Sequence, residues 1–172
     1  MKQIIIVILM SMTATLAQAQ HAVVFTTDGI AIKGYDVVAF FKEMKPVRGI
    51  DSLTYTYMDA RWLFSSRKNM EAFKANPEQY MPQYGGYCAY GTADGHEAPT
   101  EIETWTIVDG KLYFNYNQQV KDLWMKDQRG LIQKANMQWP LIKDQNWSYQ
   151  IQDAVISFRY RVRTHDFDRE PK

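Results

Sequence analysis

Cys88 has the most reactive side chain of this sequence, because it is the only cysteine among 172 residues. His96 follows in the same segment, and a thiol with an imidazole suits a soft, copper-type metal ion. With Asp94 or Glu97 as the orienting group, Cys88 and His96 also have the types needed for a cysteine nucleophile and its base. A metal site and a catalytic pair are therefore both alternatives to a buried, inert thiol.

Other donors and ligand-contacting groups surround this pair in the sequence. The soft thioethers that could join a copper site are Met44, Met58, Met70 and Met81, although methionines most often fill a core. Tyrosine-rich loops make good binding surfaces, because a large ring is ordered at low entropic cost. We therefore predict that a ligand contacts Cys88 and three nearby tyrosines, Tyr84, Tyr87 and Tyr90.

The chain opens with a segment typical of a signal peptide. Lys2 provides a positive n-region, residues 4–16 are apolar or small, and Ala17-Gln18-Ala19 supplies the small residues for cleavage. An apolar run of this length is too short for a permanent membrane anchor. We expect residues 1–19 to be removed, leaving a periplasmic or secreted protein with no membrane span.

The charge balance argues against a nucleic-acid partner. The sequence has 20 Lys and Arg against 19 Asp and Glu, whereas nucleic-acid binding depends on clustered basic residues. At 46% hydrophobic residues, the composition is that of a globular domain. A single cysteine allows no internal disulfide, so aromatic packing must stabilise the domain.

Several segments have the patterns of strands and turns. An Asp109-Gly110 turn between two aromatic-rich runs is a strong hairpin signal. The predicted strands are residues 22–26, 54–57, 61–64, 104–108 and 111–116, with turns at 28–29 and 58–60.

Capping residues and prolines mark the helices. Ser65 or Ser66 is placed to cap a helix ending at 75, and Asn117 to cap one ending at 126. Pro77 opens a further turn, a helix is expected at 129–138 before Trp139-Pro140, and 84–95 is predicted to be a structured loop. Strands and helices do not alternate as in a parallel sheet. The fold class is therefore α+β, a small single domain with an antiparallel hairpin and several short helices.

The order of these motifs resembles the YHS domain family. The first motifs are Gly34-Tyr35-Asp36-Val37-Val38-Ala39-Phe40-Phe41, Trp62-Leu63-Phe64-Ser65-Ser66 and the spacing of Phe73, Pro77 and Tyr80. Four further motifs resemble those of an exported bacterial branch of the family. They are Tyr84-Gly85-Gly86-Tyr87-Cys88-Ala89-Tyr90-Gly91, Trp105-Thr106-Ile107-Val108-Asp109-Gly110-Lys111-Leu112-Tyr113, Asn115-Tyr116-Asn117 and Trp139-Pro140. The resemblance implies a YHS-like domain over 20–140.

Metal-associated members of that family bind metal through cysteines. Residue by residue, the resemblance aligns Ala39, Ser65 and Asn69 with those cysteines. None of the three is a thiolate, on which soft-metal binding depends. The resemblance alone therefore gives no reason to assign copper to this chain.

Residues 141–172 form a C-terminal extension outside the resemblance. Phe158, Tyr160 and Val162 alternate with three arginines, which predicts an added edge strand before a frayed tail. We interpret the whole chain as an exported YHS-domain protein of undetermined activity. It is more a binding module, for an unidentified small ligand or protein partner, than an enzyme. A copper-type protein using Cys88 and a Cys88/His96 enzyme are the alternatives.

Overall fold

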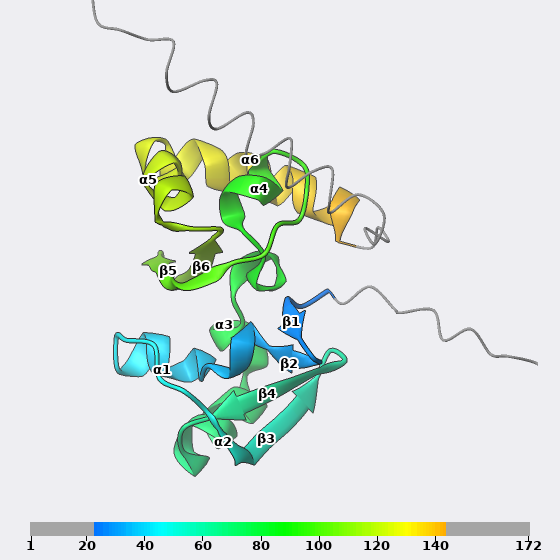
Figure 1. Cartoon of the computed structure of the whole chain (residues 1–172), viewed down its shortest axis with the longest axis vertical. Coiled ribbons are helices and arrows are strands. Elements are labelled where there is room, and N and C mark those ends of the chain that lie inside the picture. The colour runs from blue at the N-terminus through cyan, green and yellow to red at the C-terminus, as the bar shows by residue number, and fades with distance from the viewer. Residues whose placement is uncertain (1–22, 144–172) are drawn as a thin grey trace, which may run out of the picture.

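Helices and strands of similar number follow one another along residues 23–143, the part of the chain that this computed structural model describes (Figure 1). In chain order the elements are β1 (Thr26–Thr27), β2 (Ile30–Ala31), a 3-10 helix η1 (Ile32–Gly34), α1 (Val37–Lys42), β3 (Ile50–Tyr57), β4 (Ala60–Phe64), α2 (Arg67–Ala75), α3 (Pro77–Tyr80), a 3-10 helix η2 (Gln83–Gly86), α4 (Ala89–Ala93), β5 (Glu101–Val108), β6 (Lys111–Asn115), α5 (Gln118–Lys126) and α6 (Gln128–Ile142). The predicted α+β class is confirmed.

The first sheet has the order β1-β2-β4-β3. β3 pairs antiparallel with β4, as predicted, whereas β4 and β2 are parallel. The turn between β3 and β4 consists of Met58 and Asp59, whose φ angles are 50° and 57°. Two left-handed residues match the twist of a hairpin, but Asn and Gly adopt this conformation far more readily than methionine does.

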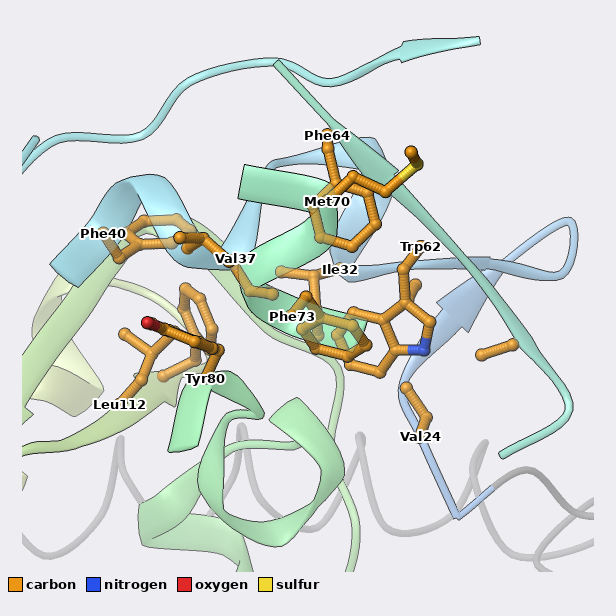
Figure 2. Packing of buried hydrophobic residues seen from close by; sticks show 14 of the residues in the cluster. Val24, Ile32, Val37, Phe40, Trp62, Phe64, Met70, Phe73, Tyr80 and Leu112 are labelled. Carbon is orange, nitrogen blue, oxygen red and sulfur yellow. The ribbon is translucent and has the colours of Figure 1, made fainter. Parts of the chain in front are cut away.

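The second sheet is the predicted hairpin of β5 and β6, and β6 separates two hydrophobic clusters. Successive side chains of a strand point to opposite faces. Leu112 accordingly enters a large cluster with the first sheet, α1 and α2 (Figure 2). Phe114 belongs to the same cluster, while Tyr113 enters a second one. The second cluster contains Trp124 and Ala135 and lies between the hairpin and α4–α6 (Figure 1). The two hydrophobic clusters thus pack against opposite faces of one hairpin.

Side-chain caps begin the helices where the sequence predicts them. Ser66 Oγ accepts a hydrogen bond from Asn69 N at the start of α2, and Asn117 Oδ1 accepts one from Val120 N at the start of α5. Each satisfies a backbone donor that has no partner within its helix. Helix α1, with its cap Asp36, is a feature that the patterns did not predict.

Several local predictions are wrong in their bounds. Strands β3 and β5 begin at Ile50 and Glu101 rather than at residues 54 and 104. The first strand begins at Thr26, not at residue 22, and the expected loop at 84–95 contains η2 and α4. Helix α6 continues through Pro140 to Ile142. Proline lacks a backbone donor, and the carbonyl that would accept from this position in a regular helix belongs to Asn136, an exposed residue. The cost of a proline in the last turn is therefore small enough for the helix to continue.

The predicted signal peptide and the predicted strand of the C-terminal extension lie outside the described residues. Within residues 23–143, no helix combines the length and the apolar character needed to cross a membrane.

Candidate functional site

The Cys88 thiol lies in the interior, at the point where α4 meets β6. It is fully buried, and its Sγ accepts a hydrogen bond from Gly91 N at 3.4 Å, which caps α4. Sγ also donates to Asn115 Oδ1 at 3.8 Å, and the same oxygen accepts from Tyr90 N at 3.2 Å. These contacts give the thiol a structural role that joins the helix to the hairpin.

Burial also sets the acidity of Cys88. It raises the pKa of the thiol to about 11, and the weaker opposing effect comes from backbone hydrogen bonds of Gly91, Tyr116 and Tyr90. A cysteine nucleophile needs the opposite, an accessible thiol with a lowered pKa. The surroundings of Cys88 therefore favour the inert thiol over the catalytic one.

His96 lies beside the same helix. Its Nδ1 is 3.9 Å from Asp94 Oδ2, and its Nε2 lies against Gly91, whose amide contacts the Cys88 sulfur. Among residues 23–143, no group of three or more His, Cys, Asp and Glu side chains is placed to hold a metal ion. Cys88 and His96 thus both lie next to Gly91, but they do not belong to a cluster of metal-binding side chains.

The three positions that the family resemblance aligns with cysteines lie around one buried carboxylate, that of Asp36. Its Oδ2 accepts hydrogen bonds from Ser65 N, Ser65 Oγ and Asn69 Nδ2 at 2.8, 2.6 and 2.8 Å. Its Oδ1 accepts from Val38 N and Ala39 N at 2.9 and 3.4 Å. The Asp36 carboxylate therefore joins α1, β4 and α2 through hydrogen bonds, and it has its full set of donors.

The three predicted ligand tyrosines have different surroundings, although Tyr84 and Tyr87 both contact Trp139. Tyr84 is 5% exposed, and its hydroxyl donates to Asn136 Oδ1 at 3.0 Å, which connects η2 to α6. Tyr87 packs against Trp139 with ring centroids 6.2 Å apart. Tyr90 packs beside the buried residues around Cys88. Of the three, Tyr84 lines a cavity between the β3–β4 turn and α6.

That cavity is a cleft of about 330 Å³ between the β3–β4 turn, the segment from α3 to η2, and α6. Its apolar wall includes Tyr57, Met58, Met81, Tyr84 and Trp139. Its polar groups are those of Glu78, Gln83 and Asn136. An apolar wall with a few polar groups, and a volume of about 300 Å³ or more, is typical of small-molecule sites.

Two residues of this cleft have a backbone conformation that disfavours their side chains. Met58 has φ 50° and Tyr84 has φ 55°. A left-handed residue other than Gly, Asn or Asp is strained by about 1 to 3 kcal/mol, and such residues cluster at functional sites. Met58 is nevertheless 42% exposed, so its side chain gains little burial in return.

Sequence reasoning included Met58, Met81 and Tyr84 among its candidates without placing them together. It missed Trp139 as a site residue, along with Glu78 and Asn136. No periodic pattern links these residues, because they come from separate turns and helices. The strongest signal in the sequence is a bulky methionine at a turn position that favours glycine.

A scan against models of protein families, a search of curated proteins and a search of solved structures each found no match to this chain. The function is therefore inferred from the geometry of the site itself.

Proposed function

We propose that the chain is a binding module whose ligand site is the cleft at Met58, Met81, Tyr84 and Trp139. The observation that carries the proposal is the cleft itself, an apolar hollow with a few polar groups at the junction of three segments. The buried, weakly acidic Cys88 thiol supports a role without cysteine chemistry. The proposal is for binding and not for catalysis.

The wall of the cleft suits a small ligand with an apolar body. Methionine side chains are flexible and polarisable, so Met58 and Met81 can adapt to a ligand's shape. Tyr84 is held rigidly by its hydrogen bond to Asn136 and by its edge contact with Trp139, with ring centroids 6.1 Å apart. A fixed aromatic wall combined with adaptable thioethers lowers the entropy lost on binding.

Methionine-methyl NMR on the full chain tests the proposal. Three ring compounds of similar size serve as probes: neutral 3-tert-butylphenol, cationic (3-hydroxyphenyl)trimethylammonium and anionic 3-hydroxybenzenesulfonate. At least one should shift the methyl resonances of Met58 and Met81, assigned with Met→Leu variants. Met44, Met125 and Met137 are exposed outside the cleft and should not respond. If all three probes leave Met58 and Met81 unchanged, or shift every exposed methionine equally, the proposal fails.

We also propose that the chain is an exported member of the YHS family, periplasmic or secreted. The ordered motifs from Gly34 to Pro140 and the signal-like residues 1–19 support this. N-terminal sequencing of the protein from a periplasmic extract or culture medium should begin at Gln20. Recovery of the intact N-terminus from the cytoplasm would contradict export.

A further inference from the structure

We infer that the cleft selects an organic cation, an ammonium group carried on a small apolar body. This inference rests on the proposed function, because it names the class of ligand for the same site. It follows from the charge of the cleft, from its aromatic rings and from its size.

Among residues 23–143, Glu78 is the only charged residue that lines the cleft, and no Lys or Arg of this part of the chain lines it. Glu78 lies on the exposed side of α3, and its carboxylate makes no ion pair or hydrogen bond within residues 23–143. The negative charge is thus available to a ligand. An anionic ligand would find no opposite charge among the lining residues and would lie near this carboxylate. Charge complementarity of this kind sets ligand class more strongly than it sets affinity.

The aromatic rings give the same preference. Tyr57, Tyr84 and Trp139 all line the cleft, and the rings of Tyr84 and Trp139 are in contact at an interplanar angle of 61°. The face of an aromatic ring carries negative potential, and cages of such rings are a common way to bind alkylammonium groups. Neutral and cationic ligands of one shape bury the same apolar surface, so only the cation gains from both the rings and Glu78.

Size separates an organic cation from a metal ion. About 330 Å³ is far more than one ion fills, since one water molecule takes about 30 Å³ of liquid volume. Glu78, Gln83 and Asn136 bring an exposed carboxylate and two carboxamides to the lining of the cleft. They are spread around a mainly apolar wall, which suits a ligand with one charged group and a larger hydrocarbon part.

The same isosteric probes test the inference, now by dissociation constants from the Met58 and Met81 methyl shifts. (3-Hydroxyphenyl)trimethylammonium and 3-tert-butylphenol differ only in the central atom of one group, nitrogen or carbon, and in charge. We expect the cation to bind about fivefold or more tightly than the neutral probe, and the anionic sulfonate to bind more weakly than both. Equal affinities for cation and neutral probe would overturn the inference while leaving the proposed function intact. Preference for the anion would overturn the inference as well, and binding by no probe would refute both.

A pair of charge-removing variants locates the selectivity. Glu78→Gln should weaken binding of the cation about threefold and leave the neutral probe unchanged, because an exposed carboxylate contributes a modest attraction. Glu103→Gln is the matched control, since Glu103 is exposed on β5 and does not line the cleft. If both variants weaken the cation equally, the effect comes from net charge, and the role of Glu78 in the cleft is refuted.

Discussion

Replacement of Asp36 by alanine should destabilise the domain more than any single helix-cap variant. The Asp36 carboxylate is fully buried and accepts five hydrogen bonds, from the start of α1, the end of β4 and Asn69 of α2. Alanine removes all five acceptor contacts at once. The groups left behind are held in the interior by the packing of three elements, so they have little freedom to find other partners.

The size of the effect follows from the donors that lose their acceptor. Loss of the α1 cap costs about 1 kcal/mol. Ser65 N then becomes a part-buried donor without an acceptor, and Asn69 Nδ2 keeps only its 3.4 Å contact with Ser65 Oγ. Losing an acceptor in this way costs about 1 to 3 kcal/mol for each donor. We expect a loss of about 4 kcal/mol in the free energy of unfolding, a large share of the roughly 5 to 15 kcal/mol that stabilises a domain of this kind.

Urea denaturation at constant pH measures this loss. Ser66→Ala is the matched control, because it removes one capping hydrogen bond, that of Asn69 N, from a less buried site. We expect the control to lose about 1 kcal/mol. If Asp36→Ala loses no more than Ser66→Ala, the carboxylate does not join α1, β4 and α2 as described.

Three further predictions concern other buried positions. Cys88 should resist Ellman's reagent in the native protein at pH 8 and react on unfolding, since burial raises the pKa of its thiol to about 11; rapid native-state labelling would contradict its burial. Burial raises the pKa of Glu97 from 4.5 to about 8, so the folded chain retains a proton that the unfolded chain releases between these values. Stability should therefore fall as the pH rises from 5 to 9, and Glu97→Gln should flatten this dependence in urea titrations; an unchanged slope would refute the assignment. Gly85→Ala should lower the melting temperature markedly, because Gly85 has φ 61° and an added Cβ would collide with the carbonyl oxygen of Val23; a wild-type melting curve would show that residues 23–25 do not pack there.

Local patterns predicted the elements that have strong sequence signals of their own. The Asp109-Gly110 turn, the Met58-Asp59 connection and the caps Ser66 and Asn117 all mark elements that the structure contains. In each case a few adjacent residues determine the backbone, so no knowledge of the tertiary fold is needed.

Helix α1 could not be predicted in the same way. Val37, Val38, Ala39 and Phe40 are all fully buried, so the helix has no polar face over these residues and shows no 3.6-residue alternation. Its start depends on Asp36, whose carboxylate is held by Ser65 and Asn69 from distant elements. The signal for this helix is therefore tertiary.

The cleft was beyond sequence reasoning for a related reason. Met58 comes from a turn, Met81 and Tyr84 from the segment after α3, and Trp139 from α6. The sequence emphasised Cys88 because a lone cysteine is chemically conspicuous, yet its exposure depends on how α4 packs onto β6. Composition could indicate the available groups, whereas only the fold determines which of them face a cavity.

The affinity of the trimethylammonium probe for two methionine-to-glycine variants tests the central claim most directly. Met58 and Met44 both have left-handed backbone, with φ 50° and 52°, and both side chains are exposed, but only Met58 lines the cleft. Glycine relieves the strained backbone at either position, so neither variant should unfold more readily through strain. We expect Met58→Gly to weaken binding about fivefold, because it removes about 1 kcal/mol of apolar contact, and Met44→Gly to bind as the wild type does. Equal dissociation constants for all three proteins would contradict a ligand site in this cleft.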